Sequence, residues 1–267
     1  MKNLLRISLI LTLFTATAHA EDRWFQVEVL VFKNPPLEID NPELWPEYTH
    51  IEQPAEYLQL GIQEMPEDGA EASAEVNDFD PTAEITVQNA ESLNPFVRLS
   101  ATEHRLSRER KTLESTANYS ILFHEAWNEP VPGRDDVIPI HISGGEQFGR
   151  QSELQGFISL YVERYLHFST DLTLVKYRKS RDPFSFAAEA NSDMPALQTL
   201  NSFGGLSLIN TDSLTSNQIA RESNNFYIAT ESAQLKESRR MRSRHIHYLD
   251  NPKFGVIILI TPINITQ

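Results

Sequence analysis

The sequence predicts an α+β fold with a mostly antiparallel sheet, one main amphipathic helix and two long insertions. Three observations carry this prediction. The closing stretch 226–263 contains an arginine-rich extended segment and then an apolar one, in which four of the five residues from Val256 to Ile260 are β-branched. Apolar residues alternate from Trp24 to Phe32, and a helical spacing occurs only between Asn94 and Ala117. Buried β-branched runs and period-two alternation are typical of strands, so most of the chain is expected in sheet.

The N-terminus has the pattern of a secretory signal peptide. Lys2 and Arg6 provide positive charge, Ile7 to Phe14 form an apolar run, and Ala18-His19-Ala20 is a small-x-small cleavage site. The apolar run is shorter than the roughly 20 residues that a membrane helix needs. We therefore expect residues 1–20 to be removed after Ala20. The remaining chain, 21–267, is expected to be one periplasmic domain without a membrane span.

Charge and cysteine content exclude several classes of site and partner. The chain of 267 residues has no cysteine, which excludes disulfides, thiolate catalysis and cysteine metal sites. Its net charge is −14, and the stretch from Glu38 to Ser92 has 15 acidic residues without a lysine or arginine. This acidity argues against nucleic acid as a partner.

The first half of the chain is expected to form a strand, an insertion, a helix and a second strand. The strand at 24–32 is followed by an acidic, proline-rich insertion at 37–94, within which 67–84 has the composition of a disordered loop. Asn94 and Pro95 resemble a helix cap and first helical residue, so a helix is predicted from Asn94 to Ala117. A strand is predicted at 119–127.

The second half is expected to consist of hairpins. Strands are predicted at 137–142, 154–168 and 172–177, with turns at 143–145 and 169–171. A polar insertion at 179–225 has no recognisable pattern. In the closing hairpin, Asp250, Asn251 and Pro252 have turn chemistry, and its second strand is predicted to lie in the middle of a sheet.

The arginine block provides the first candidate binding surface. In a strand, Arg240, Arg242 and Arg244 would share one face with Tyr248. Guanidinium groups form bidentate contacts with carboxylates. The partner would be the protein's own acids or an external anionic polymer.

Histidines provide a possible metal site. His245 and His247 would share a strand face near Asp250, a spacing that can bind zinc. The third ligand would have to come from elsewhere, and the candidates are His124, His141 and His167. Without that ligand the pair is a polar strand face, and we expect neither metal nor cofactor.

An aromatic strand face provides the last candidate. Glu163 lies between Tyr161 and Tyr165, and such rings suit both core packing and contact with sugar rings. Glu163 is also the acid on which a carboxylate-dependent hydrolase would depend. No Gly-x-Ser-x-Gly motif is present, and Gly144-Gly145 lacks the context of a phosphate loop. We therefore expect a protein that is not an enzyme.

Three segments of the chain are distinctive: WFQVEVLVF (24–32), GFISLYVERYLHFSTDL (156–172) and LKESRRMRSRHIHYLDNPKFGVIILITP (235–262). Together they resemble the CsiV family of periplasmic peptidoglycan-binding proteins. The resemblance implies a non-catalytic protein that binds peptidoglycan. It also implies support of a bifunctional penicillin-binding protein through its outer-membrane lipoprotein activator. It supplies no catalytic residues. A peptidoglycan hydrolase and a scaffold that contacts only proteins remain the alternatives, and the candidate binding residues are Arg240, Arg242, Arg244, Tyr248, Tyr161 and Tyr165.

Overall fold

The computed structural model describes residues 23–36, 46–48, 50–62, 80, 82–180, 219–222 and 225–266. The expected signal peptide at 1–20, most of the stretch 67–84 and residues 181–218 of the polar insertion lie outside these ranges. No helix in the described ranges is long and apolar enough to cross a membrane.

Most of the described chain forms two sheets. The first has the order β10 (Ile246–Asn251), β11 (Phe254–Ile265), β1 (Arg23–Lys33) and β4 (Ser120–Val131), with β3 (Ile85–Val87) pairing in parallel with the end of β11. The second has the order β2 (Leu58–Gln59), β5 (Ile140–Phe148), β6 (Gln151–Val162), β7 (Leu166–Ser180), β9 (Asn225–Arg240) and β8 (Ile219–Glu222). All other pairings except that of β2 with β5 are antiparallel, which confirms the predicted sheet type.

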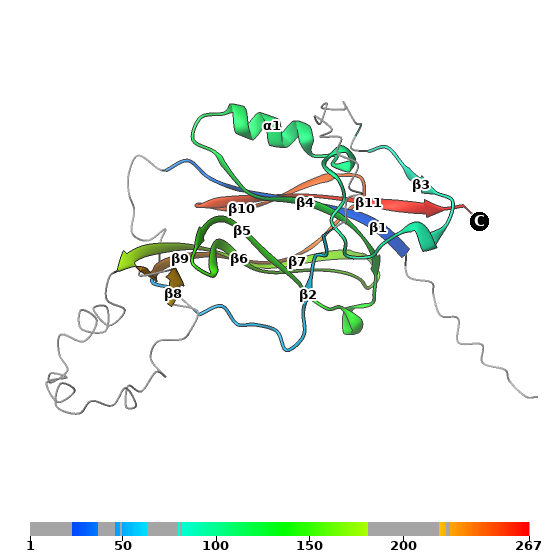
Figure 1. Ribbon diagram of the computed structural model, residues 1–267. Coiled ribbons are helices and arrows are strands. Elements are labelled where there is room, and N and C mark those ends of the chain that lie inside the picture. The colour runs from blue at the N-terminus through cyan, green and yellow to red at the C-terminus, as the bar shows by residue number, and fades with distance from the viewer. Residues whose placement is uncertain are drawn as a thin grey trace, which may run out of the picture.

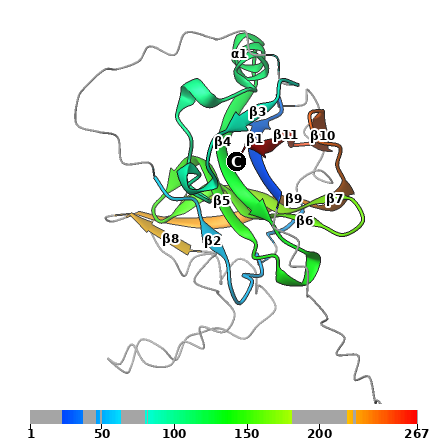
Figure 2. The ribbon, with the colours of Figure 1, turned by 90° about the vertical axis from the view of Figure 1, so that its right-hand side faces the viewer.

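The two sheets pack face to face. Val27 and Ile258 of the first sheet lie in the same buried cluster as Leu154 and Leu172 of the second. The two layers are separate in Figure 1, and Figure 2 shows them from the end. The expectation of one sheet is therefore wrong, because the strands form two separate sheets. Met241, at the point where the chain passes from β9 to β10, is buried in the shared core.

The strand at 24–32 and the central position of the closing strand were predicted correctly. β1 lies between β11 and β4, and β11 lies between β10 and β1. All residues of β1 from Phe25 to Phe32 are buried. The predicted turn does join β10 to β11, but it lies at Pro252 and Lys253, because Asp250 and Asn251 still pair with β11 as part of β10. The inner faces of β1 and β11 pack against the second sheet, and Leu30 and Leu259 on their outer faces are buried against Leu106, which agrees with their largely apolar sequences.

The helix is shorter than predicted. Helix α1 spans only Ser107–Ser115 and follows short 3₁₀ turns at Ala90–Ser92 (η2) and Ala101–Glu103 (η3). Pro95 pairs with Asn128 and Arg98 pairs with Trp127, so residues 95–98 extend along the open edge of β4. Backbone pairing with this edge replaces the first helical turns that the Asn-Pro signal predicts.

Helix α1 lies on the outer face of the first sheet, away from the second sheet (Figure 1). Leu106, immediately before the helix, is fully buried against Leu30 and Leu259. Leu113 and Ile121 pack against this small cluster. The helix therefore covers only part of the outer sheet face.

Two predicted turns are incorrect. The β6–β7 turn lies at Glu163–Tyr165, and residues 169–171 lie inside β7, paired with both β6 and β9. Residues 143–145 belong to β5 rather than to a turn, at an irregularity in its pairing with β6. A Cβ on Gly144 would lie 2.1 Å from the Leu122 carbonyl oxygen, so glycine permits this close approach of β4. A further short turn, η4 (Arg134–Asp136), follows β4.

The acidic insertion contributes to the fold at both of its ends. It provides β2 and β3, and Ile51, Leu60 and Leu93 are buried. These apolar side chains attach the described parts of the insertion to the two sheets.

Candidate functional site

The arginine block does not form a single strand face. Arg240 is the last residue of β9, whereas Arg242 and Arg244 lie in the bend that leads to β10. Arg244 has a φ of 61°, and its guanidinium lies 2.8 Å from Glu84. Arg242 is exposed. The prediction of alternating arginines is wrong because β9 and β10 belong to different sheets, so strand alternation stops at Arg240.

Arg240 instead joins aromatic residues around the β6–β7 turn. We call Arg134, Tyr161, Glu163, Tyr165, His167 and Arg240 the turn cluster. Tyr161, His167 and Arg240 form one row across β6, β7 and β9, because Tyr161 pairs with His167 and His167 pairs with Arg240. Directly opposed residues share a sheet face, so strand register places these side chains together.

Stacking contacts order the turn cluster. The Arg240 guanidinium lies 3.4 Å from the centroid of the Tyr165 ring, and the Tyr161 and His167 rings stack with centroids 5.4 Å apart. Arg134 lies over Tyr161 and pairs with Glu163 at 2.8 Å. Tyr165 remains 39% exposed. The structure thus brings together three of the predicted binding residues, Tyr161, Tyr165 and Arg240, and adds Arg134 and His167.

Tyr248 does not belong to this cluster. It lies on β10, in the other sheet, where its ring stacks on Phe32 and its hydroxyl donates to Asp250 at 2.6 Å. Burial, followed by the bond to the Asp250 carboxylate, raises the pKa of the Tyr248 hydroxyl. Tyr248 therefore has a local structural role.

The possible histidine metal site is not assembled among the described residues. His245 contacts the Ser243 carbonyl, and His247 contacts the backbone of Arg242. His141 packs beside Tyr57 and Phe157, and His167 stacks on Tyr161. His124 lies with Glu28 and His104. The candidate ligands are therefore distributed over separate parts of the described chain.

Glu28, His104 and His124 form a buried group of potential ligands on the outer face of the first sheet. The backbone amides of Arg105 and Leu106 donate to Glu28 at 2.6 and 2.9 Å, and His124 Nε2 lies 2.7 Å from the same carboxylate. Burial lowers the pKa of His104, which keeps this imidazole neutral. Because both Glu28 oxygens already accept hydrogen bonds, we assign Glu28 to anchoring the loop before α1 rather than to metal binding.

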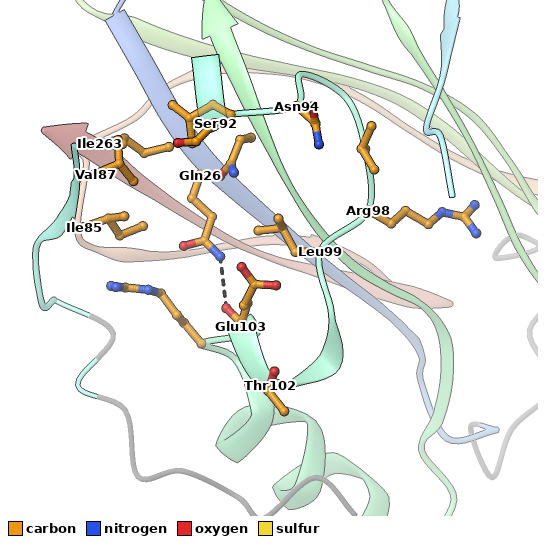
Figure 3. Close-up of a pocket in the computed structure, with 14 residues that line it drawn as sticks. Gln26, Ile85, Val87, Ser92, Asn94, Arg98, Leu99, Thr102, Glu103 and Ile263 are labelled. Atoms are coloured by element: carbon orange, nitrogen blue, oxygen red, sulfur yellow. Dashed lines mark hydrogen bonds between the residues drawn. The ribbon is translucent and has the colours of Figure 1, made fainter. Parts of the chain in front are cut away.

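A pocket of about 370 Å³ lies on the same outer face, beside η3 and β3. We call it the sheet-face pocket. Figure 3 shows Gln26 among its lining residues, with Gln26 Nε2 donating to the Glu103 carbonyl oxygen at 3.0 Å. Sequence reasoning missed this site. Its only sequence signal is the pair of polar residues Gln26 and Glu28 on one face of an otherwise apolar strand.

The pocket is lined by side chains from four separate chain segments: Gln26, Ile85, Val87, Ser92, Leu93, Asn94, Val97, Arg98, Leu99, Thr102, Glu103, Arg105, Asn128 and Ile263. Gln26 and Asn128 come from paired positions of β1 and β4 and form its polar floor. Asn94, which was predicted to cap a helix, lies on the rim instead.

Comparison with known proteins identifies one family. The model of the family described as "Peptidoglycan-binding protein, CsiV" matches residues 4–263. Comparisons with curated proteins and with solved structures gave no match. The family match covers both sheets, the turn cluster and the sheet-face pocket. The chain therefore belongs to the CsiV family of peptidoglycan-binding proteins.

Proposed function

We propose that this chain binds peptidoglycan non-catalytically through the turn cluster, in the periplasm and after cleavage at Ala20. We further propose that it supports a bifunctional penicillin-binding protein through the lipoprotein activator of that enzyme. The family supports the ligand, and the turn cluster offers suitable chemistry. The role in synthase regulation is supported by the resemblance of the sequence segments alone.

The observation that carries the proposed site is the stacking of Arg240 on the exposed ring of Tyr165. A guanidinium held against a ring keeps its N–H donors in a fixed plane. Those donors suit the carboxylates of stem peptides, while a tyrosine ring suits the apolar face of a sugar. No ion pair of Arg240 occurs within the described residues.

The geometry of Glu163 favours binding over hydrolysis. Glu163 lies in an exposed turn, with its oxygens near Arg134 and His167. A hydrolytic site needs a cleft that holds the scissile bond and limits water. Glu163 is therefore assigned to orienting Arg134.

The test is sedimentation of the mature chain, residues 21–267, with protein-free sacculi. We expect Arg240→Gln to reduce the affinity for sacculi about tenfold, because it removes a central charged contact. Arg242→Gln is the matched control, since Arg242 is an exposed neighbour outside the cluster. Equal sedimentation of both variants would reject the turn cluster as the binding site.

The same experiment distinguishes the alternatives. Release of soluble fragments from the sacculi would indicate a hydrolase, and wild-type protein that stays in the supernatant would indicate a protein-only scaffold. The two variants can then be added to purified penicillin-binding protein with its activator. Peptidoglycan synthesis that rises with Arg242→Gln but not with Arg240→Gln would link wall binding to regulation.

A further inference from the structure

A polar row across three adjacent strands contributes Gln26 and Asn128 to the floor of the sheet-face pocket, and its third member, Thr261, lies beside them. Asn128 on β4 pairs with Gln26 on β1, and Gln26 pairs with Thr261 on β11. Gln26 is 5% exposed and Thr261 is 1% exposed. Further along the same face, Leu30 is covered by Leu106. Polar side chains therefore occupy the part of this sheet face that the helix region leaves open.

This row has hydrogen-bonding capacity that the described chain does not use. Gln26 Nε2 donates to the Glu103 carbonyl oxygen, but among the described residues no donor reaches Gln26 Oε1 and no partner reaches the side-chain amides of Asn94 and Asn128. Thr261 Oγ1 is buried and has no partner there either. Buried polar groups in folded proteins are ordinarily hydrogen-bonded. Gln26 is buried and Asn128 is half-buried, so their unused amide groups mark positions for an external donor and acceptor, whereas the Asn94 amide is exposed to solvent.

Of the three charged residues of the pocket, the two arginines are directed elsewhere, whereas the Glu103 carboxylate lies beside Gln26 (Figure 3). Arg98 extends away from Gln26 in Figure 3, and its Nε lies 3.8 Å from Glu125. The Glu103 carboxylate accepts hydrogen bonds from Ser100, and the Arg105 guanidinium donates to the Ala83 carbonyl. The pocket therefore presents neutral amides on its floor and the Glu103 carboxylate beside them.

The walls of the pocket are apolar. They are formed by Ile85, Val87, Leu93, Val97, Leu99 and Ile263. A secondary amide with a short acyl group matches both parts of the pocket. Its N–H and C=O groups complement the floor amides, and its methyl group fits the apolar wall. The volume of about 370 Å³ falls within the range of about 300–1,000 Å³ found for small-molecule pockets.

We propose that the sheet-face pocket is a second subsite, which takes the acetamido group of an N-acetylated amino sugar. This inference rests on the proposed ligand, because glycan strands carry that group, but it does not depend on the turn cluster. Gln26 and Asn128 supply the amide contacts, and the wall formed by β3 and Ile263 accommodates the methyl group.

The test uses the mature chain and a soluble trimer of N-acetylglucosamine in titration calorimetry. We expect the trimer to bind and its de-N-acetylated form to bind at least about tenfold more weakly. Without the acetamido group, the side-chain amides of the pocket floor are left without hydrogen-bond partners. Equal binding of the two forms, or no binding of the trimer, would overturn the proposal. Preferential binding of an N-acetylated Ala-Ala dipeptide would assign the amide site to peptide and would also overturn it.

Two variants test whether the trimer binds in the sheet-face pocket. Asn128→Leu removes a floor amide, and Ser92→Trp blocks the pocket from an exposed position on its rim. Each should abolish trimer binding without lowering the thermal unfolding midpoint, whereas Gln234→Leu, an exposed amide change in the other sheet, should not affect binding. Full binding by a folded Ser92→Trp variant would refute the assignment.

Sedimentation separates this proposal from the proposed function. Both sites are supported if Asn128→Leu abolishes trimer binding and Arg240→Gln still reduces sedimentation with sacculi. Absence of trimer binding in a wild-type chain that sediments normally rejects only the sheet-face pocket. Normal trimer binding together with unchanged sedimentation of Arg240→Gln rejects only the turn cluster.

Discussion

Glu129 provides a quantitative test of the packing between the two sheets. It lies on β4 and is 2% exposed, beside a cavity of about 280 Å³ that includes Phe96 and Leu160. Its carboxylate accepts a hydrogen bond from Trp127 Nε1 at 2.8 Å. Burial raises the pKa of Glu129 from 4.5 to about 7, and the bond from Trp127 opposes this rise only partly.

The raised pKa makes stability depend on pH with a defined sign. The folded state holds the Glu129 proton more tightly than the unfolded state, so this contribution to stability is complete below about pH 4.5. It is lost as pH rises toward about 7, because the unfolded chain ionises first. The difference between a pKa of 4.5 in the unfolded chain and of about 7 in the folded chain corresponds to about 3 kcal/mol of unfolding free energy.

The perturbation is Glu129→Gln. Glutamine keeps an oxygen that can accept from Trp127 but cannot ionise. We expect similar free energies of unfolding for variant and wild type at pH 4.5, and a variant that is more stable by up to about 3 kcal/mol at pH 8.

The assay is urea unfolding at several pH values between 4.5 and 8. Glu163→Gln is the control, because it makes the same chemical change at an exposed turn position. The difference between Glu129→Gln and wild type should grow with pH and level off above about pH 7. A difference that stays constant over this range would refute the reasoning.

Two further predictions concern other buried positions. Glu28→Ala should lower the unfolding free energy by about 3 kcal/mol or more, because it leaves two backbone amides and a histidine without their shared buried acceptor; a loss below about 1 kcal/mol in urea unfolding would contradict this role. Gly156→Ala should strongly lower the thermal midpoint, because Gly156 has a φ of 144° and its Cβ would lie 2.1 Å from the Asp171 carbonyl oxygen. Gly133→Ala is the matched control, with its nearest neighbour at 3.9 Å. Equal midpoints for the two glycine variants would disprove the steric argument.

Local sequence patterns identified the central strands and one turn. β1 follows the alternation at 24–32, and β11 contains the β-branched run 256–260. The expected turn forms at Pro252 and Lys253, next to the residues that predicted it. These features depend on side chains that are close in sequence, so they can be recognised without knowledge of the fold.

Other local signals had two structural solutions. Asn94-Pro95 is compatible with a helix start and with an extended segment, and the free edge of β4 favours the extended segment. Residues 169–171 have turn composition, but their neighbours on β6 and β9 hold them inside β7. In both cases a strand distant in sequence decided the conformation, because backbone hydrogen bonds to that strand outweighed a weak local preference.

The sequence by itself determined the sheet-rich class, the buried central strands and the family. It also identified three of the residues that meet in the turn cluster. Only the tertiary structure decided how the hairpins pair with strands distant in sequence, and in which register. That register formed the Tyr161–His167–Arg240 row and the Asn128–Gln26–Thr261 row. The physical reason is that every residue offers nearly the same backbone groups for pairing, so the packing of the whole chain selects the register.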